Sequence, residues 1–324
     1  MYPSHERPEF GIFVRRLSEA LRARGHEVDE AVLTAGSRGV LRTPLAYLRL
    51  AARARTAARR HPDVVYAHFL VPTGVVARIT GVPYVITAHG TDVANARSHP
   101  AIAALTRRVV SGAGAVICVS EYLAERLPGA PRRLEVIDCG VDTSLFIPAP
   151  RTPGEGPRFL FAGSLAERKN VGRLMAAFAS VGEGTLTIAG AGPLAAELRA
   201  SAPAGVTFTG RVAPERMPEL FAGCDVYCQP SLVEPQGQAV LEALACGRPV
   251  VATRIGGPAE VVTPECGALV DPLSVEAIAE GMRHAAALPV PCGAAVDVAS
   301  RHTLAHAVER VERLLAEVSS AGDG

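Results

Sequence analysis

Residues Val226 to Thr253 read VYCQPSLVEPQGQAVLEALACGRPVVAT, and this stretch decides the fold class. Val226–Gln229 is a short run of β-forming residues that predicts a buried strand, and Pro249–Ala252 predicts a second one. Between them, Gly237–Cys246 carries apolar residues at helical spacing. A strand, a helix and a strand in this order are typical of a parallel sheet covered by helices. The stretch therefore predicts an α/β protein.

The same alternation of strand and helix continues in both directions from this stretch. Further strands are expected at Val28–Leu33, Asp63–His68, Tyr84–Ala88, Ala115–Val119, Leu134–Ile137, Arg158–Ala162, Thr185–Ala189, Val206–Thr209 and Ala268–Val270. Helices are expected at Phe10–Arg24, Pro44–Arg60, Pro100–Val110, Val171–Ser180, Pro193–Ala200, Pro214–Phe221 and Val275–Ala287. The pattern predicts two successive doubly wound, Rossmann-like units.

A proline-rich segment, Pro148–Pro157, separates the two halves and cannot continue a helix or a central strand. It predicts domains at residues 1–150 and 151–324. A last helix near His302–Val318 follows a second proline-rich break, and packing back on the N-terminal domain is one place for it. A Rossmann-like unit opens with a central strand, whereas here a loop leads directly into the first helix. Either the first strand is missing from this sequence, or the first sheet is one strand short.

Composition excludes several classes of protein. Residues 1–150 hold 19 arginines and 13 acidic residues, and residues 151–324 hold 14 basic and 19 acidic ones, which is less basic than a nucleic-acid-binding domain would be. No apolar run approaches the roughly 18 residues that span a bilayer. The seven cysteines sit mostly in apolar runs and are expected to be reduced, in a cytoplasmic protein. Cys224 and Cys228 lack the second Cys/His pair of a zinc site.

The loop after Val226–Gln229 carries the strongest candidate site. Ligands of open parallel sheets bind at the carboxyl ends of strands, where helix N-termini direct N–H groups at anions. The amides near Gln236 and Gly237 are therefore candidates to hold a diphosphate. Because carboxylates repel phosphates, Glu234 and Glu242 are better suited to accept hydrogen bonds from sugar or ribose hydroxyls. A solvated loop glutamate and a helix-surface glutamate remain the alternative.

A second candidate follows strand Arg158–Ala162. The chain turns at Gly163 and enters a helix through Arg168 and Lys169, and Lys169 is the only lysine in the sequence. These two cations could neutralise a diphosphate leaving group. The alternative is a basic helix N-terminus without a ligand, although the helix dipole disfavours cations there and so favours an anionic partner.

Two glycine-containing segments are weaker signals. Thr87–Asp92 places His89 at the end of a strand, where a functional and a structural role are both open. Ala189–Leu194 resembles part of a dinucleotide fingerprint but lacks its third glycine, which is weak support for NAD.

Together these segments resemble glycosyltransferase family 4, a large group of retaining enzymes with the GT-B fold. The resemblance covers nearly the whole chain and is carried by the pair Glu234 and Glu242 in the spacing E-x7-E, by Leu241–Thr253, Gly163–Val171, Thr209–Val212, Gly140–Asp142, Thr87–Asp92 and Glu9–Ile12. It implies two Rossmann-like domains that face a central cleft, with the acceptor site in the first and the donor site in the second.

By that resemblance, Glu242 binds the ribose hydroxyls and Glu234 orients the donor sugar. Lys169 stabilises the departing diphosphate, and His89 approaches the anomeric region or the hydroxymethyl group of the sugar. The implied donor-binding residues are Gly11, Gly163, Ser164, Arg168, Arg211, Val212, Gln236, Gly237, Gln238, Ala239 and Glu242. The family works without a metal or other cofactor, through front-side displacement. Ser164 departs from the pattern, because the family usually has an arginine there, and the first strand is absent before Gly11.

The expected function is transfer of a hexose from a UDP- or GDP-sugar to a hydroxyl of a lipid-linked glycan, a polysaccharide or a small natural product. A nucleotide-sugar-binding protein without transfer and a sugar-nucleotide epimerase are the alternatives. Arg38–Arg60 holds seven arginines and no acid, with Leu41, Leu45, Leu48 and Ala52 spaced for one helical face, so peripheral contact with the inner membrane face is a further hypothesis. A basic solvated helix that packs on the sheet is the alternative.

Overall fold

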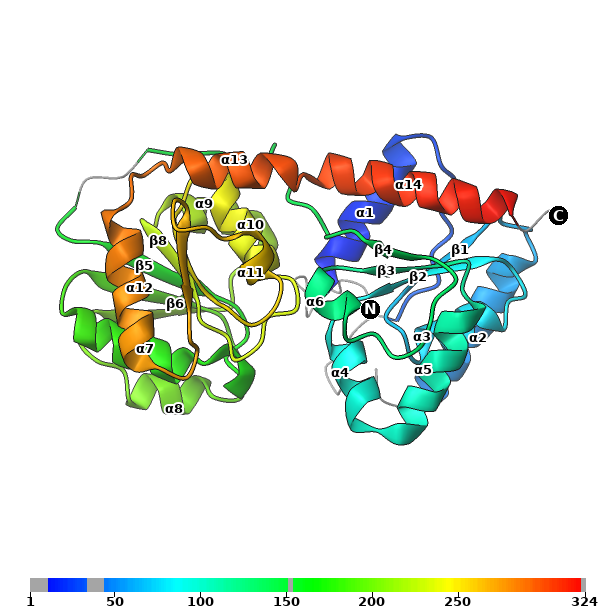
Figure 1. Cartoon of the computed structure of the whole chain (residues 1–324), viewed down its shortest axis with the longest axis horizontal. Coiled ribbons are helices and arrows are strands. Elements are labelled where there is room, and N and C mark those ends of the chain that lie inside the picture. Colours follow the sequence, from blue (N-terminus) through cyan, green and yellow to red (C-terminus); the bar gives the residue numbers. More distant parts are fainter. Residues whose placement is uncertain (1–10, 34–43, 151–153, 322–324) are drawn as a thin grey trace. The chain divides into compact units, whose positions relative to one another are not determined.

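The computed structural model describes residues 11–33, 44–150 and 154–321, and its contacts divide the chain into two compact units (Figure 1). The first unit comprises residues 1–139 and 305–324, and the second comprises residues 140–304. The predicted boundary at residue 150 differs from this division, which falls between Cys139 and Gly140. Within the described ranges, no helix is long and apolar enough to cross a membrane.

The first unit is built around four parallel strands. Its strands are β1 (Val65–His68), β2 (Tyr84–Ala88), β3 (Ala115–Cys118) and β4 (Leu134–Val136), and its helices are α1 (Ile12–Ala23), α2 (Pro44–Ala58), α3 (Thr73–Arg78), α4 (Thr91–Ser98), α5 (Pro100–Gly112), α6 (Glu121–Ala124) and α14 (Leu304–Ser320). The strands lie in the order β1-β2-β3-β4.

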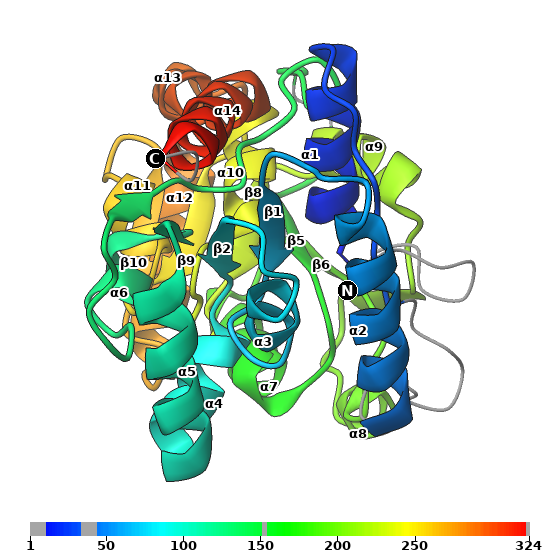
Figure 2. The same ribbon diagram turned by 90° about the vertical axis from the view of Figure 1, so that its right-hand side faces the viewer.

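Helices cover both faces of this sheet (Figure 2). Ile86 and Val116 pack toward α3, α4 and α5, whereas the neighbouring residues Val85 and Ile117 pack toward α14 and Leu17 of α1. Because successive residues of a strand point to opposite faces, strands of this kind must be apolar on both sides, as their sequences are. The last helix thus lies on the first sheet, in the place that the sequence analysis considered for it.

The predicted strand Val28–Leu33 is not a strand. Its residues are partly or fully exposed, whereas a strand of a parallel sheet is buried on both faces. Side chains of α1 hold the segment instead: Arg22 donates to the carbonyl of Val28 (2.9 Å), and Ser18 donates to the carboxylate of Glu30 (2.7 Å). The sequence predicts no strand before Gly11, and residues 1–10 lie outside the described ranges.

The second unit is built around six parallel strands. Its strands are β5 (Arg158–Ala162), β6 (Thr185–Ala189), β7 (Val206–Gly210), β8 (Val226–Gln229), β9 (Val250–Thr253) and β10 (Gly267–Val270). Its helices are α7 (Val171–Val181), α8 (Ala195–Ala200), α9 (Met217–Ala222), α10 (Gln238–Ala245), α11 (Pro258–Val261), α12 (Val275–Ala287) and α13 (Gly293–Arg301), with 3-10 turns at Glu167–Lys169 and Pro214–Arg216.

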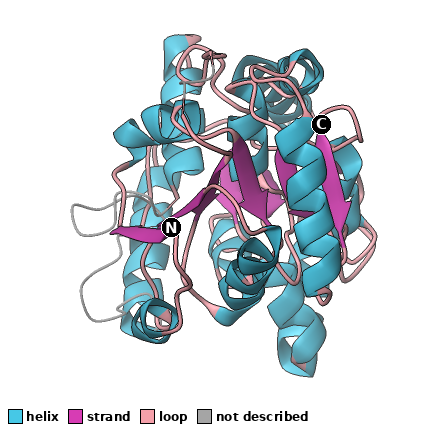
Figure 3. Ribbon diagram, turned by 90° about the vertical axis from the view of Figure 1, so that its left-hand side faces the viewer, coloured by secondary structure: helices cyan, strands magenta, loops and turns pink. Residues whose placement is uncertain are grey.

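The strand order β10-β9-β8-β5-β6-β7 places the first strand in the middle of the sheet. The chain moves outward from β5 through β6 to β7 and then returns to the other side of β5 with β8. The loops after β5 and β8 therefore diverge to opposite faces, which makes this edge the topological switch point where open α/β sheets bind ligands. Figure 3 shows the strands between their covering helices.

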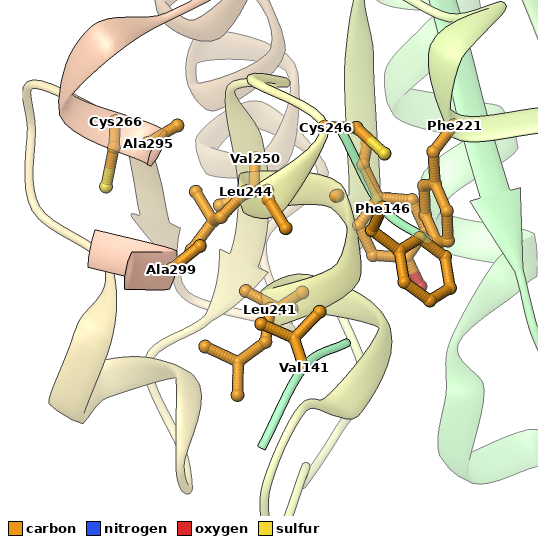
Figure 4. Packing of buried hydrophobic residues seen from close by; sticks show 14 of the residues in the cluster. Val141, Phe146, Phe221, Leu241, Leu244, Cys246, Val250, Cys266, Ala295 and Ala299 are labelled. Atoms are coloured by element: carbon orange, nitrogen blue, oxygen red, sulfur yellow. The ribbon is translucent and has the colours of Figure 1, made fainter. Parts of the chain in front are cut away.

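Two clusters of apolar side chains fill the second unit. Helices α7, α8 and α12 cover one face, and α9, α10 and α13 cover the other. Phe146 belongs to the second cluster, where its ring lies edge-on to that of Phe221 at 5.9 Å (Figure 4). Val141 forms a parallel bridge with Thr303, so the residues after Cys139 complete the second core before the proline-rich segment begins.

Candidate active site

The loop after β5 packs closely against the loop after β6. Gly163 donates its N–H to the carbonyl of Ala189 (2.9 Å), and Leu165 donates to that of Ala191 (3.0 Å). Gly190 has a φ of 153°, and a Cβ there would lie 1.8 Å from the carbonyl oxygen of Gly163. The Ala189–Leu194 segment therefore needs its first glycine for the approach of two loops, which explains it without a dinucleotide.

Hydrogen bonds also join the loop after β5 to the loop after β8, across the switch point. Asn170 donates from its side-chain amide to the carbonyl of Pro230 (2.9 Å), and the N–H of Leu232 donates to the carbonyl of Arg168 (2.8 Å). Arg168 also donates from its guanidinium to the carbonyl of Val233 (2.9 Å). These bonds fix the position of each loop relative to the other. Asn170, which the sequence analysis did not select, is 6% exposed and central to them.

The structure brings Lys169 and Glu234 together as a buried ion pair. The ammonium group of Lys169 lies 2.6 Å from Oε2 of Glu234, and the two residues are 9% and 8% exposed. The same oxygen accepts hydrogen bonds from Nε2 of Gln229 (3.0 Å) and Oγ of Ser231 (3.2 Å). Because these donors converge on Oε2, the second oxygen of Glu234 is the one available to a ligand hydroxyl. Arg168 is farther away, 3.6 Å from the same oxygen, and its side chain is half exposed.

Gln229 adds an acceptor that the sequence analysis missed. This last residue of β8 is 3% exposed, and its Oε1 is buried without a hydrogen-bond partner in the described ranges. Native structures leave few such groups unpaired, so an unpaired acceptor beside an ion pair is a feature that a ligand would satisfy. A glutamine at the end of a strand, next to the switch-point loop, was the available signal.

Helix α10 begins directly after this loop. Gly237 is its N-cap residue, and the N–H groups of Gln238 and Ala239 belong to the first turn, which has no intrahelical acceptors. The side chain of Gln236 donates to Oε1 of Gln238 (2.9 Å), and that of Gln238 donates to the carbonyl of Gly140 (2.8 Å). The two glutamine side chains are thus engaged with the protein, so their backbone amides are the groups suited to an anion.

Glu242 lies in α10 and is 9% exposed. Burial raises the pKa of Tyr227 well above 10, and the charges of Glu234 and Glu242 raise it further. Tyr227 therefore stays protonated and donates to the carbonyl of Ala162, the last residue of β5 (3.1 Å). The charges of both glutamates thus raise the pKa of the same buried tyrosine.

A third loop, after β9, supports Glu234. The N–H of Glu234 donates to the carbonyl of Ile255 (3.0 Å), and the carbonyl of Glu234 accepts a hydrogen bond from the N–H of Gly257 (2.9 Å). Gly256 has a φ of 119°, and a Cβ there would lie 1.9 Å from the carbonyl oxygen of Glu234. These two glycines follow a strand in the sequence, but nothing in the sequence showed which loop they would contact.

The remaining predicted residues of the second unit surround this region less closely. Ser164 and Arg211 are exposed, and Val212 packs on the core beside α9 and α10. Gly210, directly before Arg211, accepts a hydrogen bond from the N–H of Gly190 (2.7 Å), so the loop after β7 joins the loop after β6.

Cys224 and Cys228 do not form a shared metal site. Cys228 lies within β8 and packs in the cluster on one face of the sheet, whereas Cys224 precedes the strand and packs in the cluster on the other face. All seven cysteines lie in the described ranges and are free thiols.

His89 and Gly11 lie in the first unit. Gly11 is the N-cap residue of α1, and His89 directly follows β2. Asp92 accepts hydrogen bonds from the N–H groups of His89 (3.1 Å) and Gly90 (2.8 Å), which fixes the turn. The ring of His89 lies 3.1 Å, nitrogen to nitrogen, from that of His68, which the sequence analysis did not select.

Comparison with known proteins assigns the chain to a family. Residues 11–145 match the family described as Glycosyltransferase Family 4, and residues 156–287 match Glycosyl transferases group 1. The GDP-mannose-dependent alpha-(1-6)-phosphatidylinositol monomannoside mannosyltransferase of Mycolicibacterium smegmatis is 33% identical over 259 residues, which are 71% of this chain and 67% of that protein. The chain belongs to glycosyltransferase family 4.

Other relatives share a smaller part of their length with this chain. The putative teichuronic acid biosynthesis glycosyltransferase TuaC of Bacillus subtilis is 29% identical over 68% of this chain and 61% of that protein. The 2-deoxystreptamine glucosyltransferase of Streptomyces kanamyceticus is 29% identical over 63% of each chain. The chain thus matches less than two thirds of the length of these two relatives.

Solved structures of glycosyltransferases confirm the predicted GT-B fold. Sucrose-phosphate synthase from Thermosynechococcus elongatus superposes with a TM-score of 0.83 at 20% identity, over 96% of this chain and 93% of that one. Anabaena HepE in complex with UDP-glucose gives a TM-score of 0.70 at 22% identity, over 92% of this chain and 88% of that one. At these identities the likeness concerns the fold.

Proposed function

We propose that this family 4 protein transfers a hexose from a nucleoside diphosphate sugar to a hydroxyl group, with retention of configuration and without a metal ion. The observation that carries the proposal is the ion pair of Lys169 with Glu234 at the switch point of the second sheet, beside the first turn of α10. Lys169 supplies a cation for a diphosphate, the first turn of α10 supplies N–H groups for it, and Glu234 supplies a carboxylate for a sugar.

Each group has a distinct task in this reaction. The bond between the anomeric carbon and the diphosphate oxygen breaks and its electron pair goes to the diphosphate, while the acceptor oxygen bonds to the same face of the sugar. The acceptor proton passes to the departing phosphate oxygen. A lysine ammonium has three N–H groups, and one of those of Lys169 faces Glu234. The other two, with the amides of Gln238 and Ala239, would stabilise the charge that develops on the diphosphate.

The donor sugar and nucleoside would be held by acceptor groups. Oε2 of Glu234 is occupied by protein donors, so Oε1 would accept a hydroxyl of the hexose. Glu242 would bind the ribose. His89 of the first unit would contact the hexose near its anomeric carbon or hydroxymethyl group. HepE in its crystal structure holds UDP-glucose, and the mycobacterial relative uses GDP-mannose, so UDP- and GDP-sugars are the donor candidates.

A donor screen tests the proposal. The protein would be incubated with UDP-, GDP-, ADP- and TDP-sugars in the presence of EDTA, and thermal stability and nucleotide release would be measured. One donor should raise the melting temperature by mass action and release its nucleotide, and NMR of the glycoside should show the donor's anomeric configuration. Binding without release would instead identify a sugar-nucleotide-binding protein, and an epimerised donor would identify an epimerase. Loss of release in EDTA would contradict the metal-free reaction.

We further propose that α2 contacts an anionic membrane surface, where a lipid-linked acceptor would be found on the cytoplasmic face. Leu45 and Leu48 are 55% and 66% exposed on this helix, while Ala46 and Leu50 pack inward. The arginines of the same helix are exposed as well, and α2 contains no acidic residue. Exposed leucines beside arginines suit the boundary between headgroups and acyl chains.

Vesicle sedimentation tests this contact. The double variant Arg53→Glu/Arg59→Glu should lose binding to vesicles with phosphatidylglycerol, and neither protein should bind pure phosphatidylcholine. Arg107→Glu, an exposed arginine of α5, is the matched control and should bind like the wild type. Equal sedimentation of the double variant and the wild type would contradict the proposal.

A further inference from the structure

Two histidines meet at the carboxyl ends of β1 and β2. His68 is the last residue of β1 and pairs in register with Thr87, and His89 follows the end of β2. Nδ1 of His68 lies 3.1 Å from Nε2 of His89, and the rings are stacked with centroids 5.4 Å apart. Neighbouring parallel strands thus place the two rings in direct contact.

Both rings are neutral at neutral pH. Burial lowers the pKa of His68 to about 3, and burial together with His68 lowers the pKa of His89 well below 6.5. A neutral imidazole has one N–H donor and one acceptor nitrogen, so a hydrogen bond between the two rings couples their tautomers. If His68 donates, the proton of His89 must sit on Nδ1; if His89 donates from Nε2, its Nδ1 is an acceptor.

Other contacts hold the two rings in place without competing for the ring nitrogens of His89. The rings of Phe13 and Phe69 lie 4.7 and 4.6 Å from that of His89. The ring of Tyr66 lies tilted against that of His68, with centroids 4.5 Å apart, and its hydroxyl is hydrogen-bonded to Thr87. A small cavity of about 20 Å³ adjoins both histidines, together with Phe13, Tyr66 and Thr87. In the described ranges, the hydrogen bond with His68 is therefore the contact that ties the tautomer of His89 to the tautomer of His68.

We propose that His68 is a positioning residue, whose ring fixes His89 in one tautomer and one orientation so that Nδ1 of His89 meets the sugar as a single kind of hydrogen-bonding group. This extends the proposed function, in which His89 contacts the donor. The coupling of the two rings is a property of the protein alone, so it can be measured without any substrate.

Nitrogen-15 NMR of the full chain with labelled histidines tests the coupling directly. In the wild type, the two ring nitrogens of His89 should show the separate shifts of one tautomer. In His68→Phe they should move toward a common, averaged value, and in His99→Phe, an exposed histidine of the same unit, they should stay unchanged. Averaged shifts in the wild type, or unchanged shifts in a folded His68→Phe protein, would overturn the proposal.

Kinetics then test the consequence for turnover. With the donor found in the screen, His68→Phe should lower kcat about tenfold and leave KM within about twofold, as loss of an orienting partner does. His68→Gln, which can still donate or accept toward His89, should recover most of kcat. A changed tautomer with unchanged kcat would overturn the positioning role. If the wild type turns over no donor, the proposed function fails, while the NMR result still decides the coupling.

Discussion

Both units place polar side chains at the carboxyl ends of parallel strands. In the second unit these side chains form an ion pair, whereas in the first unit they are two neutral rings. Lys169 and Glu234 form the ion pair, and they come from loops on either side of a topological switch point. In the first unit, His68 ends β1 and His89 follows the adjacent strand β2, and burial lowers the pKa of both rings so that they are neutral.

This difference follows from the partners that each sheet supplies. A buried charge is tolerated only when it is paired and hydrogen-bonded, and Glu234 has a cation and two further donors. The histidines have aromatic rings and each other, so they lose their charge instead. A charged site suits a diphosphate, and a neutral pair suits a hydroxyl.

Removing the cation of the second unit should have the largest effect. We expect Lys169→Met to lower the rate of nucleotide release about 10³-fold, because one preorganised group that stabilises developing charge contributes on the order of 4 kcal/mol. Arg254→Gln, which removes an exposed arginine of the same unit, should leave the rate unchanged. A Lys169→Met rate within tenfold of the wild type would contradict a role of this charge in transfer.

The same substitution should also lower stability, by about 3 kcal/mol, because it leaves Glu234 buried without its cation. Adding Glu234→Gln should recover part of this loss, since a neutral amide needs no counter-charge. The exposed ion pair of Arg216 with Glu219 is the control, and Arg216→Gln should cost less than about 1 kcal/mol. Urea unfolding measures all of these, and an unchanged midpoint for Lys169→Met would show that the pair contributes no net stability.

The glycine beneath Glu234 gives a steric test. We expect Gly256→Ala to lower the free energy of unfolding by about 2 to 3 kcal/mol and to reduce transfer, because the new Cβ would displace the backbone of Glu234. Gly182 also has a positive φ but has open space around it, so Gly182→Ala should cost only about 1 kcal/mol. Thermal unfolding and nucleotide release separate the two variants, and equal costs would show that the contact with Glu234 does not matter.

The neutral histidines should make the first unit sensitive to acid. A histidine whose pKa is lower in the folded than in the unfolded protein binds fewer protons when folded, so its contribution to stability is present above pH 6.5 and is lost as the pH falls toward about 3. His68→Gln should reduce the slope of stability against pH in this window, by up to about 1.4 kcal/mol per pH unit.

Urea unfolding at about pH 7 and about pH 5 provides the measurement. The exposed His99→Gln variant should keep the slope of the wild type. The same slope in His68→Gln would show that His68 is not held neutral, and would remove the electrostatic contrast between the two units.

Much of the fold follows from local sequence. Strands Tyr84–Ala88, Arg158–Ala162 and Val226–Gln229 and helix Val275–Ala287 have the predicted bounds. Short helices such as α6 and α11 were missed, because four residues are too few to show a helical period. The predicted helix at Pro214–Phe221 divides into a 3-10 turn and α9, where Pro218 interrupts the sequence of N–H donors.

For the candidate site, too, part could be predicted from the sequence and part could not. The types of residue at Lys169, Glu234 and Glu242 and their positions after strands could be predicted from the sequence. Their pairing could not, because Lys169 and Glu234 are 65 residues apart and meet only where β8 returns beside β5. Gln229, Gly256 and His68 were missed for the same reason, since each acts through a residue on another strand or loop.

Local sequence is enough to predict an α/β chain of two units with a glycosyltransferase family 4 pattern, because strand and helix periods and loop motifs are local properties. Three features depend on tertiary packing instead: the sole lysine pairs with Glu234, the residues after Cys139 complete the second core, and two histidine rings lie within hydrogen-bonding distance. Those outcomes depend on which strands become neighbours, and strand order is set by the packing of the whole sheet.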